Sequence, residues 1–211
     1  MPDLWREFSQ VALAHLLAVA SPGPDFALVL RQSLTHGRRT ALWTSLGIGT
    51  AILLHVTYSL LGLGLLIRSS ALWFGVVKYA GAAYIAWLGV SALRARPRPA
   101  SAPAGAEAAP PPPPAGAVAT GFLTNALNPK ATLFFISLFV LLVSPATPKL
   151  IQAGYGLWMA LATVAWFSLV TVGCTHAEVR RRFLRHGHWI DRALGVVFLL
   201  FAASLALAAV R

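Results

Sequence analysis

An apolar stretch near the start of the chain, FSQVALAHLLAVASPGPDFALVLRQS at residues 8–33, is long enough to cross a lipid bilayer. A transmembrane α-helix needs about 20 predominantly apolar residues to span the hydrocarbon core. In the middle of this stretch, the segment Ser21–Asp25 (SPGPD) interrupts the apolar residues with two prolines. Each proline lacks a backbone N–H and disrupts the helical hydrogen bonds. The sequence therefore predicts a membrane helix that is broken near mid-membrane.

Similar apolar runs recur along nearly the whole chain. Hydrophobic residues make up 57% of the sequence and charged residues only 11%, whereas a soluble domain carries about 25% charged residues. With the first run at 8–33, the apolar runs fall at 41–67, 71–93, 117–143, 150–174 and 192–210. We therefore expect an all-α, polytopic membrane protein of about six transmembrane helices, with membrane lipid as its surroundings.

A stretch rich in proline and alanine, residues 94–116, separates the third run from the fourth. The run Pro110–Pro114 cannot be helical throughout, so we expect an extended, solvated linker. The chain is thus predicted to comprise a first three-helix unit at 1–93, the linker at 94–116, and a second three-helix unit at 117–211.

Lysine and arginine are distributed unequally between the predicted loops. The loops after the first, third and fifth runs carry three, three and five of these residues, eleven in total, whereas the opposite side carries four. Loops rich in Lys and Arg stay in the cytoplasm, so both termini are predicted to lie on the other, outer side. This distribution also accounts for the net charge of +11 without nucleic acid as a partner; a homo-oligomer is compatible with the sequence.

A second break, at Asn125–Lys130 (NALNPK), lies near the middle of the fourth run, and Pro129 follows Pro24 by 105 residues. The two units enter the membrane from opposite sides, which together with the matching breaks predicts two inverted three-helix repeats. Irregular backbone at membrane depth must be buried in protein or line a water-filled cavity. Paired broken helices therefore indicate a transporter site.

Each break carries one charged residue. Asp25 lies near the start of a half-helix, where the helix dipole favours an acid and a simple capping role would suffice. Asn128 is expected to cap the next half-helix and Pro129 to be its first residue. Lys130 would then be a cation at the positive end of a helix, near mid-membrane, where a lysine costs roughly 2.5–3.5 kcal/mol. Either Asp25 or a substrate carboxylate could offset this cost.

The two broken helices resemble signatures of the lysine exporter family, LysE/RhtB. Ser21–Phe26 (SPGPDF), followed by Gly47-Ile-Gly49, is similar to the first-helix signature, residues 78–94 to the third helix, and Gly121–Lys130 (GFLTNALNPK) to the fourth-helix signature. The resemblance covers nearly the full chain. It implies an exporter of amino acids or close derivatives in the bacterial inner membrane, driven by the proton motive force.

Our main hypothesis is therefore secondary active export of a small zwitterionic or cationic amino acid. In this hypothesis Lys130 receives the substrate carboxylate, and Asp25 receives its ammonium group or a coupling proton. The other predicted substrate-binding residues, all within the two breaks, are Gly23, Pro24, Asn125, Asn128 and Pro129.

Two other classes of function remain as alternatives. A metal-cation exporter of the same architecture would need several carboxylates or thiolates within its helices, and only Asp25 is available. An intramembrane enzyme would need a second acid, a nucleophile–base pair or a metal set, and the sequence shows none. The single cysteine, Cys174, excludes an internal disulfide and a multi-cysteine metal site. We expect neither an enzyme nor a cofactor.

Overall fold

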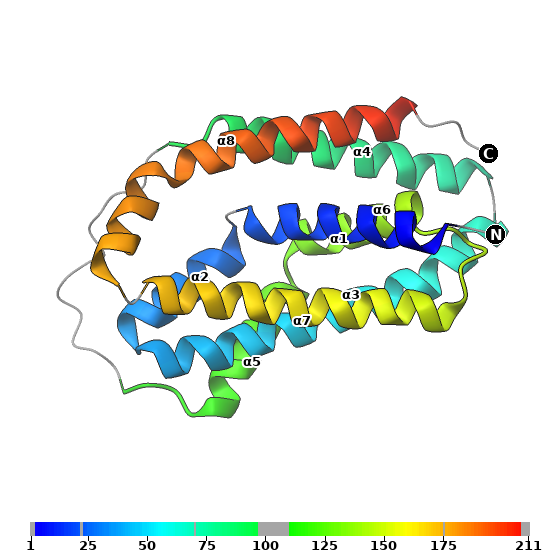
Figure 1. Ribbon diagram of the computed structural model, residues 1–211. Helices are drawn as coiled ribbons and strands as arrows, with labels where there is room; N and C mark the ends of the chain where they lie inside the picture. Colours follow the sequence, from blue (N-terminus) through cyan, green and yellow to red (C-terminus); the bar gives the residue numbers. More distant parts are fainter. Residues whose placement is uncertain (1–2, 22, 70, 97–109, 175, 208–211) are drawn as a thin grey trace.

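The computed structural model describes residues 3–21, 23–69, 71–96, 110–174 and 176–207, and these residues fold into helices without a β-strand (Figure 1). In chain order the helices are α1 (Leu4–Ala20), α2 (Pro24–Thr35), α3 (Arg38–Ser69), α4 (Ala71–Leu93), α5 (Pro114–Ala126), α6 (Pro129–Leu142), α7 (Lys149–Cys174) and α8 (Ala177–Leu207). The prediction of an all-α protein is confirmed. Residues 97–109, most of the predicted linker, lie outside the described residues.

Both predicted helix breaks are present. The pair α1 and α2 bends by 53°, and the pair α5 and α6 bends by 60°. Each pair is long and apolar enough to count as one bent membrane span, and α3 and α7 each contain a straight one, so the described residues hold up to four candidate spans. The class of polytopic membrane protein is confirmed, whereas the number of six spans and the inverted repeat stay predictions.

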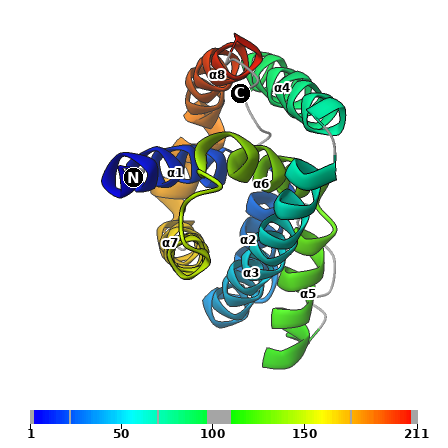
Figure 2. The same ribbon diagram turned by 90° about the vertical axis from the view of Figure 1, so that its right-hand side faces the viewer.

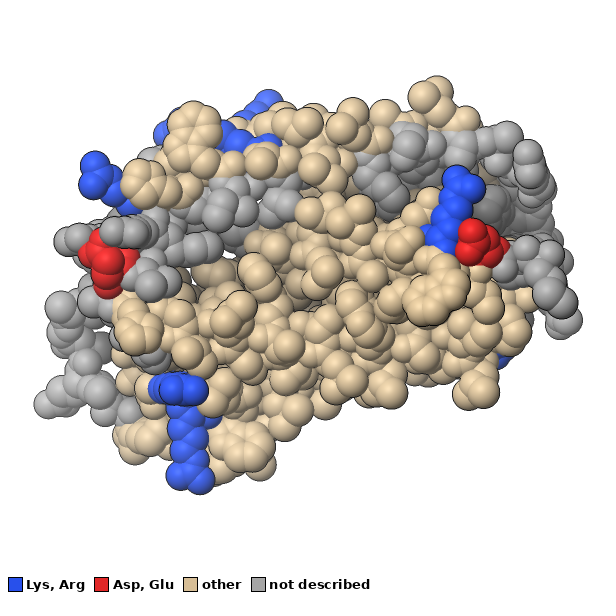
Figure 3. Space-filling view, in the orientation of Figure 1, with Lys and Arg blue, Asp and Glu red and all other residues tan. Residues whose placement is uncertain are grey.

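The surface of the protein suits a lipid environment. In Figure 3 the charged side chains drawn in colour lie toward the two ends of the long axis, and the described residues visible in the middle of this face are uncharged. Large apolar side chains are exposed on several helices, among them Leu13, Leu61, Trp87, Leu157, Leu161 and Leu169. So much apolar surface would favour aggregation in water, but lipid tails solvate it as well as a protein interior does.

The arginine-rich segment before the last apolar run is helical, and here our prediction of a loop was wrong. Because α8 begins at Ala177, it contains all five basic residues that our sequence analysis counted in the loop after the fifth run, which are Arg180, Arg181, Arg182, Arg185 and Arg192. Hydropathy marks only the apolar part of a helix and gives no signal for charged turns that extend it. Arg192 donates a hydrogen bond of 3.2 Å to the Ala95 carbonyl, just beyond α4.

Glycines allow two pairs of helices to touch through their backbones. A Cβ atom added to Gly47 in α3 would lie 2.0 Å from a carbonyl oxygen of α5, and one added to Gly121 in α5 would lie 2.1 Å from the carbonyl oxygen of Thr44. Likewise, α4 and α8 lie side by side (Figures 1 and 2), and a Cβ at Gly89 would lie 2.9 Å from the Gly195 carbonyl oxygen. Small residues are typical of such close membrane-helix contacts.

Hydrogen bonds hold the first helix against the second half of the chain. The buried Glu7 carboxylate accepts a hydrogen bond of 2.9 Å from the Ser144 backbone N–H and another of 2.9 Å from the Thr147 hydroxyl. Both partners lie in the connection between α6 and α7. Since α1 ends at the first break, this contact helps to position the break within the protein.

Candidate substrate-binding site

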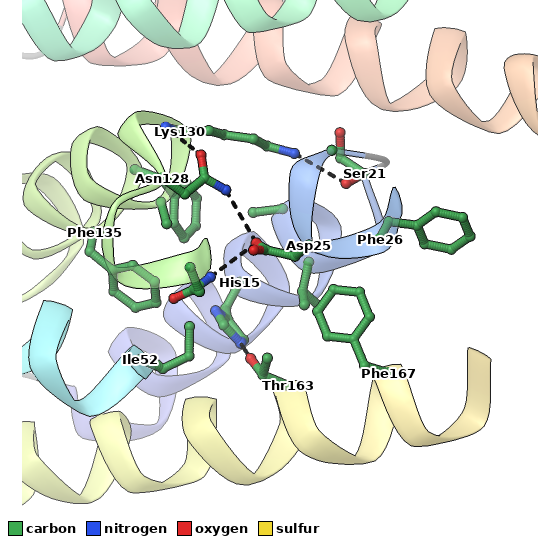
Figure 4. Close-up of a pocket in the computed structure, with 16 residues that line it drawn as sticks. His15, Ser21, Asp25, Phe26, Ile52, Asn128, Lys130, Phe135, Thr163 and Phe167 are labelled. Carbon is green, nitrogen blue, oxygen red and sulfur yellow. Dashed lines mark hydrogen bonds between the residues drawn. The ribbon is translucent and has the colours of Figure 1, made fainter. Parts of the chain in front are cut away.

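The two helix breaks border one cavity in the interior (Figure 4). The empty space between the residues that line it amounts to about 470 Å³, part of which is open to solvent. Five of the seven predicted site residues line it, namely Gly23, Asp25, Asn125, Asn128 and Lys130. Pro24 and Pro129 instead are the first residues of α2 and α6, where their missing N–H groups leave no hydrogen bond unmade.

The Asp25 carboxylate is held by both asparagines of the other break. Its Oδ2 atom accepts hydrogen bonds from the side-chain amides of Asn125, at 3.0 Å, and Asn128, at 3.2 Å. Its Oδ1 atom is buried and has no hydrogen-bond partner among the described residues. A buried carboxylate oxygen without a donor is costly, so this atom is suited to a cationic ligand group.

Lys130, in the second break, forms a hydrogen bond to the first break. As predicted, Asn128 caps α6, because its side chain accepts a hydrogen bond of 2.9 Å from the Lys130 backbone N–H. The Lys130 ammonium donates a hydrogen bond of 3.1 Å to the carbonyl of Ser21, the residue that caps the C-terminal end of α1. That end of a helix carries partial negative charge. The end of α1 therefore offsets part of the cost of a partly buried lysine.

The orientation of the Asn125 amide is set by His55 of α3, which does not itself line the cavity. His55 Nε2 lies 3.1 Å from both the backbone oxygen and the side-chain oxygen of Asn125. Both oxygens are acceptors, so Nε2 is the donor. Because His55 occupies the amide oxygen, the amide nitrogen of Asn125 faces Asp25. The other ring nitrogen of His55 is hydrogen-bonded to the Tyr58 hydroxyl.

His15 and Thr163 also line the cavity, and our sequence analysis did not assign them to the site. His15 lies in α1, and its Nε2 atom is 3.1 Å from the Met159 carbonyl and 3.0 Å from the Thr163 hydroxyl, both in α7. Phe134 and Phe135 of α6 form an apolar wall beside the His15 ring. The only signal for His15 in the sequence is a polar residue within an apolar helix upstream of the break.

The cavity thus combines, on a largely apolar background, one carboxylate, one ammonium group and the side-chain amides of two asparagines. Among the described residues, no cluster of three or more His, Cys, Asp or Glu side chains could hold a metal ion. Opposite charges on two half-helix ends, enclosed by apolar walls, suit a small zwitterion better than an apolar ligand.

In a polytopic helical protein, paired helix breaks that border a cavity with charged side chains are typical of membrane transporters. Residues 16–209 match the model of the LysE type translocator family, and the chain belongs to this family. The resemblance noted in the sequence motifs is thereby confirmed.

The chain is similar over nearly its full length to curated efflux proteins. It is 31% identical to the threonine efflux protein of Salmonella typhi over 94% of this chain and 96% of that one, and 30% identical to its namesake in Escherichia coli K12 with the same coverage. It is also 30% identical to the homoserine/homoserine lactone efflux protein of Salmonella typhimurium, over 94% of this chain and 95% of that one. No solved structure gives a significant match.

Proposed function

We propose that this protein is a secondary active exporter of amino acids or close derivatives across the bacterial inner membrane, driven by the proton motive force. The observation that supports this proposal is the pair of charges at the two helix breaks. Asp25 offers to the ammonium group of a substrate a buried oxygen that has no hydrogen-bond partner among the described residues. Lys130, at the other break, lies on the same cavity and suits its carboxylate.

The names of the relatives agree with this chemistry. Threonine, homoserine and homoserine lactone share an α-amino group, which is the part of the substrate that we assign to Asp25. The similarity of this chain to efflux proteins for such molecules also favours this proposal over a metal-cation exporter and over an intramembrane enzyme.

The coupling proton is proposed to share Asp25 with the substrate. A carboxylate that binds an ammonium group can instead bind a proton, and either one neutralises its charge. Exchange of the two at one carboxylate would link outward movement of the amino acid to inward movement of a proton. The bends between the half-helices on both sides of the cavity provide places where the helix ends can move.

Transport into inverted membrane vesicles tests the proposed function. We expect vesicles that contain the protein to accumulate labelled amino acids when respiration acidifies their interior, and to lose this accumulation after addition of a protonophore. Vesicles without the protein are the control. Accumulation of no amino acid in the panel would contradict amino-acid export, and accumulation that persists with the protonophore would contradict proton coupling.

The proposed topology places both termini in the periplasm, with 1–93 and 117–211 as inverted repeats. In a Cys174→Ala background, we expect Ala146→Cys, in the α6–α7 connection, to react with a membrane-impermeant maleimide in intact cells. Thr35→Cys, at the end of α2, should react only after the inner membrane is opened. Both residues are exposed, so a difference in labelling reports the side of the membrane. Reaction of Thr35→Cys in intact cells would contradict this orientation.

A further inference from the structure

The protonation of the His15 ring follows from its partners. Nε2 lies 3.1 Å from the Met159 carbonyl oxygen, which can only accept a hydrogen bond. Nε2 must therefore carry a proton. The ring is only 2% exposed and packs against Phe134, Phe135 and Trp158, surroundings that disfavour a charged imidazolium. In the neutral ring, the other nitrogen, Nδ1, is then a hydrogen-bond acceptor.

The acceptor Nδ1 has no donor within the described part of the chain. It is buried and lacks a hydrogen-bond partner among the described residues. Buried polar groups in native proteins are nearly always hydrogen-bonded, so an exception calls for an explanation. Because His15 lines the cavity, a molecule bound there can supply the missing donor.

The position of His15 relative to the two charges indicates which part of a substrate would meet it. In Figure 4, Lys130 and His15 lie on opposite sides of Asp25, and the His15 ring reaches down toward Thr163. An amino acid with its ammonium group at Asp25 and its carboxylate toward Lys130 would extend its side chain toward His15. Ile52 and Phe135 form the apolar surroundings at this end of the cavity.

We infer that His15 selects substrates whose side chain carries a hydroxyl group, such as β- and γ-hydroxy amino acids, by accepting a hydrogen bond at Nδ1. This inference rests on the proposed function and adds the substrate class. An amino acid with a methyl group in place of the hydroxyl would fill the same volume but leave Nδ1 without a donor. A site built to bind a hydroxyl rejects such an analogue, whereas an apolar pocket scarcely distinguishes the two.

Transport of two isosteric pairs tests the inference, namely threonine with valine and homoserine with norvaline. In inverted vesicles we expect the unmodified protein to accumulate the hydroxyl-bearing member of at least one pair about tenfold more efficiently. His15→Phe keeps an aromatic ring and removes Nδ1, and it should bring this ratio close to one. The ratio is measured within one vesicle preparation, so it does not depend on the amount of folded protein.

Two further variants separate hydrogen bonding from packing. His15→Gln has an amide that can donate toward Met159 and accept from a substrate hydroxyl, so we expect it to retain most of the selectivity. His55→Phe removes another buried histidine, which also stacks on Phe135 but does not line the cavity. We expect this variant to lower transport of both members of a pair equally and to leave their ratio unchanged.

Each result of these transport measurements either supports or overturns the role of His15 in selecting a hydroxyl group. Equal transport of both members by the unmodified protein would overturn the inference, although amino-acid export itself would stand. An unchanged ratio in His15→Phe would also overturn it, as would a ratio of one in His55→Phe. Transport of no amino acid at all would contradict the proposed function in the earlier vesicle experiment, before any ratio is measured.

Discussion

Replacing Asp25 with asparagine is expected to lower amino-acid transport by about 100-fold and to leave the protein folded. Asparagine has the shape of aspartate, and its amide oxygen can take the place of Oδ2, which accepts hydrogen bonds from Asn125 and Asn128. Its amide NH₂ then occupies the position of Oδ1, where it repels an ammonium group. Loss of a charged hydrogen bond in a buried site costs up to about 3 kcal/mol, which corresponds to roughly 100-fold.

The measurement is accumulation of labelled amino acid in inverted vesicles, normalised to the amount of protein in the membrane. Asp3→Asn is the matched control, because Asp3 is exposed and only caps the start of α1, a position where asparagine serves equally well. We expect Asp3→Asn to transport at nearly the normal rate. Normal transport by Asp25→Asn would contradict the assignment of the substrate ammonium and the coupling proton to this carboxylate.

Homoserine and its lactone distinguish the roles of the two charges, because the lactone has an ammonium group but no free carboxylate. Asp25→Asn should therefore reduce transport of both compounds to a similar extent. Lys130→Met should reduce transport of homoserine by about tenfold or more and affect the lactone much less. Equal losses for both compounds in Lys130→Met would show that Lys130 does not bind the carboxylate.

The double variant separates a binding site from a structural ion pair. If the two charges served only to neutralise each other, each single change would leave a buried charge unpaired, and the double change would relieve the defect. We expect instead that Asp25→Asn combined with Lys130→Met transports no better than Asp25→Asn alone. Recovery of transport in the double variant would contradict the proposed substrate site.

A single methyl group at Gly121 is expected to destabilise the protein by about 2–3 kcal/mol. The Cβ atom of Gly121→Ala would lie 2.1 Å from the Thr44 carbonyl oxygen and 3.1 Å from the Ile48 backbone nitrogen. Backbone atoms cannot rotate away as a flexible side chain would, so α3 and α5 must separate, and overpacking of this kind typically costs about 1–3 kcal/mol. Because α5 also carries Asn125, the shift should weaken the hydrogen bond to Asp25 and lower transport as well.

Heating of the detergent-solubilised protein, followed by measurement of the monodisperse fraction, tests this prediction. Gly154→Ala is the matched control, because Gly154 lies within α7 and a Cβ there would meet nothing within 4 Å. Alanine favours a helix over glycine by about 0.5–1 kcal/mol, so the control should be as stable as the unmodified protein or slightly more so. Equal thermal stability of both variants would contradict a direct backbone contact between α3 and α5.

Local chemistry allowed the helix breaks to be predicted from the sequence. A proline interrupts helical hydrogen bonds wherever it stands inside a helix, so Pro24 and Pro129 marked both breaks, and the cap formed by Asn128 followed from neighbouring residues. The charge on Lys130 also showed that a compensating partner was needed. One such partner, the Ser21 carbonyl, depends on how the two breaks pack against each other, and no local pattern encodes this arrangement.

Contacts between distant segments account for what the sequence did not predict. His15 joins the cavity through Met159 and Thr163, which are more than 140 positions further along the chain. The sequence did not predict that the arginine-rich part of α8 is helical, and the reason is different. Hydropathy separates segments by polarity, and this part of the helix differs from the apolar part in polarity but not in backbone conformation.

The pairing of α4 with α8 through Gly89 and Gly195 has a consequence for how new cargo specificities arise. None of the described residues that line the cavity belongs to either helix. The pair nevertheless packs against α1 and α6 through a shared apolar cluster. It therefore supports two of the helices that form the cavity without lining the cavity itself. Substitutions that alter cargo can therefore accumulate at the lining positions of α1, α2, α3, α5, α6 and α7 while this support is preserved, and a laboratory library for new export strains is best confined to those positions.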